Sequence, residues 1–344
     1  MRSDAPSPPA SKTAADRPTL KTIADLSGFA VATVSRALAE DPKIAESTRR
    51  RVAEIARQIG YEPDRAARRL RTGRTMVINL ILDPHFEVLG FGNALLIGLT
   101  TALEGSGYNL VVTPHFDDTD ELAPIRHIVV NRQADGVIFT RTAPFDSRAR
   151  FLMEHGFPFV SHGRTDFTEE HSWVDFDNEE FAYRGTLRLI EKGCRKVCAI
   201  LPPKTLTFRQ HLQYGFMRAV REFGIDTLVP DVITLDTPAD EIRDWACGIL
   251  DGPNRPDGFL CPGEASYLAI RSACQKCGLV LGRDLWVVSK SISGVISQID
   301  PEADTIQEDV EQAGRLMAQH LLTMLSEPSV RPPMTLQSAK PLFL

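Results

Sequence analysis

The chain has 344 residues, 43% hydrophobic and 24% charged, which is the composition of a soluble protein with two or three domains. Its longest uncharged apolar stretch, VLGFGNALLIGLTTAL, is too short to cross a bilayer, and the N-terminus lacks the apolar core of a signal peptide. These features exclude a membrane or secreted protein and predict a cytoplasmic one.

The net charge of -6 is unevenly distributed along the chain. Residues 1–75 carry 15 Lys and Arg against 9 Asp and Glu, whereas the remainder carries 24 against 36. A basic head on an acidic body indicates that only the head meets a polyanion. The alternative is that the basic residues form an ordinary solvated face.

Residues 1–17, rich in Pro, Ser and Ala, predict a disordered arm. Two short helices are expected next. Thr19 is suited to cap the first and Gly28 to end it, while Val31, Val34 and Leu38 give the second an apolar face. Two such helices joined by a tight turn predict a helix-turn-helix motif.

A third helix is predicted up to Gly60, with its apolar face at Val52, Ile55, Ala56 and Ile59. Its outer face carries arginines suited to phosphates, namely Arg49, Arg50, Arg51 and Arg57. The second helix has short side chains and one long donor, Arg36, which could bond guanine O6 and N7 in a major groove. These patterns favour DNA binding over a plain three-helix interaction module.

Residues 19–75 resemble the headpiece of the LacI/GalR family of bacterial transcription regulators. The resemblance lies in TLKTIADLSGFAVATVSRALA at 19–39 and KIAESTRRRVAEIARQIGYEPDRAARRL at 43–70. It implies a DNA-binding headpiece over 18–63. It also implies that base edges are faced by Val31, Ala32 and Arg36, and that phosphates lie near Thr33, Ser35 and Arg49.

The headpiece departs from the family pattern at three alanines. Ala30 and Ala45 stand where the family has serines that cap helices and touch phosphates, and Ala39 replaces an asparagine. Loss of a cap costs about 0.5–2 kcal/mol. We therefore expect a weaker hold on the DNA backbone, with Arg50, Arg51 and Arg57 available to compensate.

Residues 64–75, DRAARRLRTGRT, predict a hinge that is too short to be a stable helix alone. Its arginines would gain partners on DNA, so folding on binding is expected. The resemblance implies minor-groove contacts from Ala67, Leu70 and Arg71, with Leu70 as the wedge that kinks the duplex. The alternative is a solvated basic linker.

From residue 76, short β-rich runs alternate with helical segments, which predicts parallel sheets. Strands are expected at MVINLIL, NLVVTP, DGVIF, FPFVS, KVCAIL, DVITL, DGFLC and WVVSK, and helices near 207–223, 239–251 and 264–277. The order of these segments resembles the family's two-lobed, periplasmic-binding-protein-like α/β core. The predicted fold is thus an all-α headpiece plus an α/β core over 76–344. The expected lobes are 76–174 with 306–326, and 175–305 with 329–344.

Ligands of open α/β lobes bind beyond the carboxyl ends of the strands. The residues there are His85, Phe86, His115, Arg141, His162, Arg164, Glu264 and Lys290. Phe86 and Phe208 could stack on a sugar ring, while Arg209, Glu264 and Glu308 could bond its hydroxyls. Each of these side chains could equally serve packing.

The family match is poorest at the ligand site. The family's pocket arginine is replaced by Leu212, with Arg209 and His211 nearby as substitutes. An acidic pair is replaced by SKSI, which contains Lys290. This gain of a cation favours an acidic or phosphorylated ligand, but a neutral sugar held by Glu264 and Glu308 is the preferred expectation.

Neither a metal, a cofactor nor an enzyme activity is expected. CQKC at 274–277 has no second pair at a zinc spacing, and GFGNAL at 90–95 lacks the last small residue of a dinucleotide fingerprint. No catalytic constellation is recognisable. The sequence therefore predicts a ligand-responsive regulator of carbohydrate or related metabolite genes, acting as a repressor, that binds operator DNA and a sugar or sugar derivative. A homodimer is expected, since no leucine-heptad tail of the kind that makes tetramers is visible. The rival reading is a sugar-binding module or enzyme whose head is not used for regulation.

Overall fold

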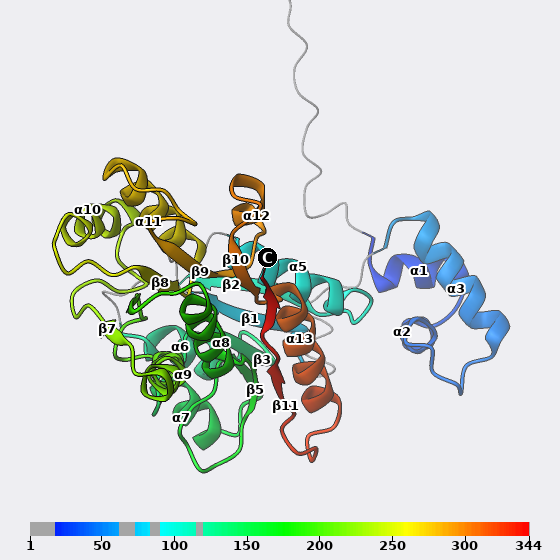
Figure 1. Ribbon diagram of the computed structural model, residues 1–344. Coiled ribbons are helices and arrows are strands. Elements are labelled where there is room, and N and C mark those ends of the chain that lie inside the picture. The colour runs from blue at the N-terminus through cyan, green and yellow to red at the C-terminus, as the bar shows by residue number, and fades with distance from the viewer. Residues whose placement is uncertain (1–17, 62–72, 83–89, 115–119, 344) are drawn as a thin grey trace, which may run out of the picture. The chain divides into compact units, whose positions relative to one another are not determined.

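The structure is a computed structural model that describes residues 18–61, 73–82, 90–114 and 120–343. The chain forms two compact units, residues 1–75 and 76–344 (Figure 1). The predicted arm and most of the predicted hinge lie outside the described residues. So do six of the predicted contact residues: Ala67, Leu70, Arg71, His85, Phe86 and His115.

The head contains three helices, α1 (Leu20–Ser27), α2 (Val31–Leu38) and α3 (Glu46–Gln58). Thr19 caps α1 as predicted, because its hydroxyl accepts from the backbone N–H of Thr22, and Gly28 ends the helix in the left-handed conformation. Ile23, Val34 and Val52 are fully buried between the helices. The helical periodicity therefore predicted these core residues correctly, but Val31, which it placed on the apolar face of the second helix, is exposed.

Ala30 and Ala45 begin α2 and α3 without a side-chain cap. The backbone N–H groups at these two helix starts consequently lack the hydroxyl acceptor that a serine would bring.

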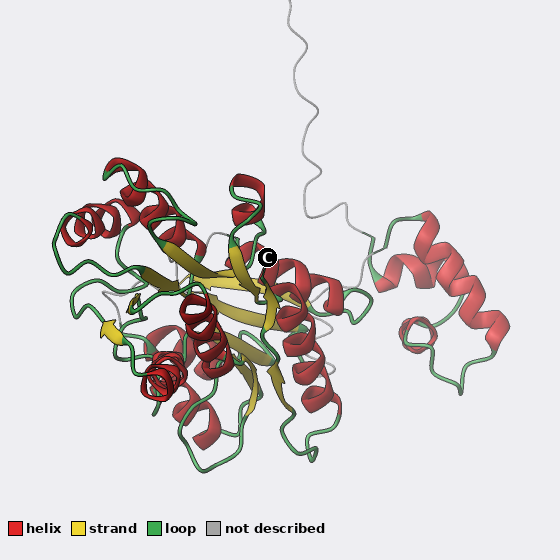
Figure 2. Cartoon of the chain, viewed as in Figure 1, coloured by secondary structure: helices red, strands yellow, loops and turns green. Residues whose placement is uncertain are grey.

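The core contains two six-stranded sheets with helices packed on them (Figure 2). The first sheet has the order β11-β5-β4-β3-β1-β2. Its strands are β1 (Val77–Leu82), β2 (Asn109–Pro114), β3 (Gly136–Thr140), β4 (Phe159–His162), β5 (Ser172–Phe176) and β11 (Met334–Gln337). All its strand pairs are parallel. The helices of this lobe are α5 (Phe91–Leu103), α6 (Leu122–Val130), α7 (Ser147–Glu154) and α13 (Val310–Ser326).

The second sheet has the order β12-β10-β9-β8-β6-β7, and only its edge strand β12 is antiparallel. Its strands are β6 (Lys196–Ala199), β7 (Asp226–Leu228), β8 (Gly258–Cys261), β9 (Trp286–Ser291), β10 (Asp304–Gln307) and β12 (Lys340–Leu342). The helices are α8 (Asn178–Glu191), α9 (Thr207–Phe223), α10 (Ala239–Leu250), α11 (Glu264–Lys276) and α12 (Val295–Ile299).

Two details differ from the sequence-based expectation. Residues 231–235, predicted to form a strand, form an irregular segment instead. The strand beside β6 is β7 at Asp226–Leu228. Residues 329–344 were expected in the second lobe, but β11 pairs with β5 of the first sheet and only β12 joins the second. The chain therefore passes from one sheet to the other near residues 177, 308 and 338, and both lobes gain a strand after α13.

Gly215 allows α9 to pack tightly on α8. A Cβ atom at this position would overlap the carbonyl oxygen of Glu179. Backbone contact of this kind explains why a glycine lies in the middle of a long helix. Within the described ranges, no helix combines the length and apolarity needed to span a bilayer.

Candidate functional sites

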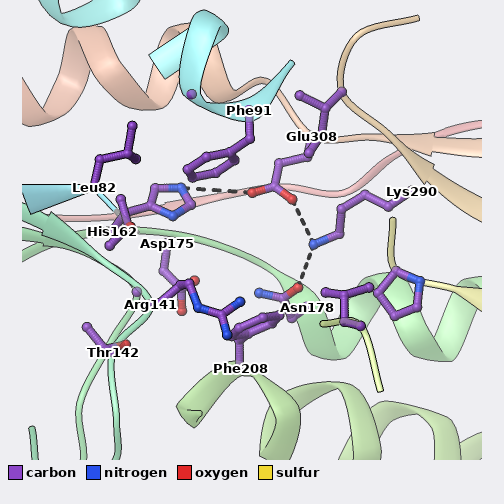
Figure 3. Close-up of a pocket in the computed structure, with 16 residues that line it drawn as sticks. Leu82, Phe91, Arg141, Thr142, His162, Asp175, Asn178, Phe208, Lys290 and Glu308 are labelled. Carbon is purple, nitrogen blue, oxygen red and sulfur yellow. Dashed lines mark hydrogen bonds and ion pairs between the residues drawn. The ribbon is translucent and has the colours of Figure 1, made fainter. Parts of the chain in front are cut away.

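A cavity of about 250 Å³ lies where the carboxyl ends of strands from both sheets meet. Figure 3 shows side chains from the two lobes around it. The first lobe contributes Leu82, Phe91, Gly92, Thr140, Arg141, Thr142, His162, Gly163 and Asp175, and the second contributes Asn178, Phe208, Leu235, Pro262, Lys290, Ile292 and Glu308. Five of the predicted ligand-binding residues thus line one cavity: Arg141, His162, Phe208, Lys290 and Glu308.

Lys290 is a buried cation with a buried partner. Its Nζ lies 2.7 Å from Oε2 of Glu308 and donates to Oδ1 of Asn178 at 2.8 Å. It also lies 4.6 Å from the ring centroid of Phe176. Lys290 lies in β9, Glu308 directly follows β10 and Asn178 begins α8. These distant segments come together only in the tertiary structure (Figure 3). The lysine charge is therefore balanced inside the protein.

His162, the last residue of β4, presents an imidazole ring to the cavity. Its Nε2 is buried and makes no hydrogen bond within the described part of the chain, and it lies 3.9 Å from Oε1 of Glu308. Burial lowers the pKa of His162, against the opposing effect of Glu308, so the ring is neutral at pH 7. The edge-on ring of Phe91, 5.3 Å away between centroids, orients it. A ring nitrogen so placed can bond a hydroxyl group.

Arg141 follows β3 with φ at 59°, a conformation that non-glycine residues rarely adopt. Its guanidinium makes two hydrogen bonds to the carboxylate of Asp236. This second cation of the cavity is also paired.

Arg164 and His211 do not line the cavity but support it. Arg164 Nε donates to Oδ2 of Asp175 at 2.7 Å, and its Nη2 lies 3.3 Å from Nδ1 of His211. Burial, together with the charge of Arg164, lowers the pKa of His211. This arrangement fixes the buried carboxylate of Asp175 at the cavity wall.

Two predicted ligand-binding residues are directed elsewhere. Arg209 is buried and donates to the carbonyl oxygen of Pro202, while its neighbour Leu212 lies in the hydrophobic core. Glu264 accepts hydrogen bonds from the backbone N–H groups of Ile292 at 2.8 Å and Ser293 at 2.9 Å. Its carboxylate thus organises the turn after β9. Neither side chain lines the cavity, so the structure does not support the expectation that they reach the ligand, which stays a prediction.

Sequence reasoning missed several cavity residues, among them Asp175 and Asn178. Both lie in VDFDNEE, where a strand passes directly into a helix. That strand–helix junction was the available signal, because it places polar side chains at the carboxyl edge of the sheet. Phe91 and Ile292 are apolar residues whose role no local pattern indicates.

On the head, α2 has one exposed face. Val31, Ala32 and Arg36 are exposed, and Thr33 and Ser35 are half-buried, which fits the predicted face toward DNA. Arg49, predicted near phosphates, is half-buried and donates to the carbonyl oxygens of Glu40 and Asp41 in the turn after α2.

Comparison with known proteins agrees with this two-unit organisation. Residues 19–64 match the model for bacterial regulatory proteins of the lacI family, and residues 186–342 match a periplasmic binding protein-like domain. The HTH-type transcriptional regulator RafR of Escherichia coli is 30% identical over 295 residues, covering 85% of this chain and 84% of RafR.

Two solved structures share the fold. The lac repressor dimer bound to operator and the anti-inducer ONPF has a TM-score of 0.80 at 18% identity, covering 95% of this chain and 98% of that one. A complex of the transcriptional regulator CelR with cellobiose has a TM-score of 0.68 at 24% identity, with the same coverage. The predicted family and fold class are confirmed, and the chain belongs to the LacI family of bacterial regulatory proteins, as a transcriptional regulator with a helix-turn-helix head and a periplasmic-binding-protein-like core.

Proposed function

We propose that this regulator binds a neutral sugar in the cavity between its lobes. The observation that carries the proposal is the pairing of the two described cations that line the cavity, Arg141 and Lys290, and of Arg164 behind its wall. Arg141 is matched by Asp236, Arg164 by Asp175 and Lys290 by Glu308. Among the described residues, an incoming anion would find no cation at the cavity without a carboxylate partner, whereas hydroxyl groups can bond these fixed polar groups without displacing them.

The remaining surfaces of the cavity suit a sugar. Phe91 and Phe208 offer aromatic rings, and the neutral imidazole of His162 offers a ring nitrogen with no bond in the described chain. Apolar walls with a few oriented polar groups are typical of small-molecule sites. The cellobiose bound to CelR, a protein of the same fold, adds support for a carbohydrate.

An acidic or phosphorylated effector is the second candidate, because Lys290 lines the cavity. To reach Nζ, such a ligand would have to displace Glu308, leaving a buried carboxylate without its cation. That cost disfavours it.

The head is proposed to bind an operator, with the exposed face of α2 in the major groove. Val31, Ala32 and Arg36 would face base edges there. The related lac repressor was solved as a dimer on operator. A homodimer of this chain would accordingly bind a roughly palindromic site. Effector binding would shift the population between two lobe arrangements with different affinities for DNA.

Calorimetric titration of the full chain tests the effector class. The panel contains neutral mono- and disaccharides, sugar phosphates and sugar acids. We expect heat of binding only from neutral sugars. Phe208→Ala should weaken binding of that sugar, whereas the control Phe223→Ala, at an exposed position of the same helix, should not. Operator affinity is then measured with and without the sugar that binds. Binding of sugar phosphates alone would instead establish the anionic class.

A further inference from the structure

Arg36, the long donor on the exposed face of α2, is held by a carboxylate from the following turn. Its Nε donates to Oδ2 of Asp41 at 2.9 Å. The two side chains are 52% and 26% exposed, so the pair lies at the surface of the head. Exposed ion pairs contribute little to folding stability, so the main effect of this pair is on the position of the Arg36 side chain.

Asp41 itself is fixed by the turn. Its Oδ1 accepts from the backbone N–H of Lys43 at 2.9 Å, and its own N–H donates to the carbonyl oxygen of Arg36 at 3.1 Å. Arg49, from α3, donates to the carbonyl oxygens of Glu40 and Asp41 on the other side. The hydrogen bond from Lys43, and then that from Arg36, lowers the pKa of Asp41, so the carboxylate is ionised at neutral pH.

This arrangement affects how the guanidinium of Arg36 can meet DNA. The hydrogen bond from Nε to Asp41 favours one rotamer of Arg36 and leaves the two terminal nitrogens for the two-point contact that guanine accepts. A side chain ordered before binding loses less entropy on binding. The adjacent negative charge also offsets the attraction of Arg36 for any phosphate, which carries no sequence information.

We propose that Asp41 is a positioning residue that makes Arg36 read a base rather than a phosphate. The proposal rests on the proposed function, in which α2 enters the major groove. It adds that sequence discrimination by Arg36 depends on a residue outside the recognition helix.

The test uses the full chain and a duplex selected by the unmodified protein from a random-sequence library. Asp41→Asn retains an oxygen for the N–H of Lys43 but loses the charge that pairs with Arg36. Glu40→Gln is the matched control, because it removes the same charge from the neighbouring, exposed residue. Affinities are measured at fixed salt for the selected duplex, for each single base-pair change in it, and for an unselected duplex.

Both variants should bind the unselected duplex more tightly, since each removes one negative charge. Only Asp41→Asn should lower discrimination at the base pair read by Arg36, by about two- to tenfold. Arg36→Ala should abolish that discrimination, a loss of roughly tenfold to a hundredfold. Adding Asp41→Asn to Arg36→Ala should cause no further loss, because the two residues act as a unit.

Three outcomes would overturn the proposal. If Asp41→Asn and Glu40→Gln have the same base-pair profile, Asp41 contributes only charge, and the DNA-reading role of α2 stands. If Asp41→Asn weakens all duplexes and also lowers the melting temperature, its role is structural. If Arg36→Ala alters no base preference, Arg36 reads no base, and the proposed contact of α2 fails together with the role of Asp41.

Discussion

Arg141 of the first lobe and Asp236 of the second are joined by a two-point ion pair at the edge of the cavity. Nη1 lies 3.0 Å from Oδ1 and Nη2 lies 2.5 Å from Oδ2, with the two side chains 17% and 29% exposed. Arg141 and Leu235, the neighbour of Asp236, both line the cavity. The pair therefore ties the lobes together beside the site where an effector would bind.

Replacing Asp236 should loosen this contact between the lobes. Charge-assisted hydrogen bonds are worth about 1.5–3 kcal/mol. We expect Asp236→Ala to weaken effector binding by roughly tenfold to a hundredfold, measured by calorimetry. The control is Asp231→Ala, which removes an exposed carboxylate paired with Lys204 in the same lobe and should leave affinity unchanged. Equal affinities in both variants would show that the interlobe pair does not influence effector binding.

Replacing only one member of the buried pair of Lys290 and Glu308 should destabilise the protein more than replacing both. Lys290→Met leaves a buried carboxylate unpaired and should lower the free energy of unfolding by about 3–5 kcal/mol. The double variant Lys290→Met/Glu308→Gln should recover more than half of this loss in urea denaturation. Lys204→Met, at an exposed pair, should show no measurable change. If the double variant is no more stable than Lys290→Met, the two residues do not act as a pair.

Glu264 should contribute to stability through the turn after β9. Glu264→Ala leaves the N–H groups of Ile292 and Ser293 without their acceptor, at an expected cost of about 2–5 kcal/mol. Glu264→Gln keeps an acceptor oxygen and should lose much less, and Glu302→Ala, at an exposed site, should lose almost nothing. Chemical denaturation measures all three. Reduced effector affinity at unchanged stability would instead place Glu264 in contact with the ligand.

His162 should make the core sensitive to acid. Burial lowers its pKa in the folded protein below the ordinary value of about 6.5. As the pH falls below about 6.5, the unfolded chain takes up a proton at this residue before the folded protein does. The contribution of neutral His162 to the free energy of unfolding is therefore complete above that pH, and it is lost as the pH falls through the folded pKa. The same sign applies to three other histidines whose pKa burial lowers: His171, His211 and His320.

The measurement is the melting temperature between pH 7.5 and 5. His162→Gln should show a shallower decline than the unmodified protein, whereas His155→Gln, at an exposed position, should not. A parallel decline in both variants would mean that His162 does not contribute to the acid sensitivity.

Two glycines in helices should respond oppositely to the same substitution. Gly215→Ala forces α9 away from α8 and should destabilise the protein by about 1–3 kcal/mol or more. Gly248, in α10, has open space at the corresponding position, so Gly248→Ala should stabilise by about 0.5–1 kcal/mol. Thermal unfolding compares them, and equal effects would contradict the close approach of α8 and α9.

The amino-acid sequence by itself determined the head and the architecture. The spacing of Ile23, Val34 and Val52 specifies which helix faces are buried, because helical periodicity is a local property. Alternation of strands and helices likewise indicated two parallel sheets. The strand near β7 was misplaced because short apolar runs such as 231–235 occur in irregular segments as well as in strands.

The ligand site depended on the tertiary structure. Their positions after strands suggested Lys290 and His162 as ligand-binding residues, and both line the cavity, since residues after parallel strands share one edge of a sheet. Their contact with a ligand stays a prediction. Sequence position could not indicate that Lys290 is neutralised by Glu308, or that Glu264 turns to the backbone of Ile292. Those outcomes depend on which groups from distant segments come within hydrogen-bond distance, and a buried charge takes whichever partner the fold brings to it.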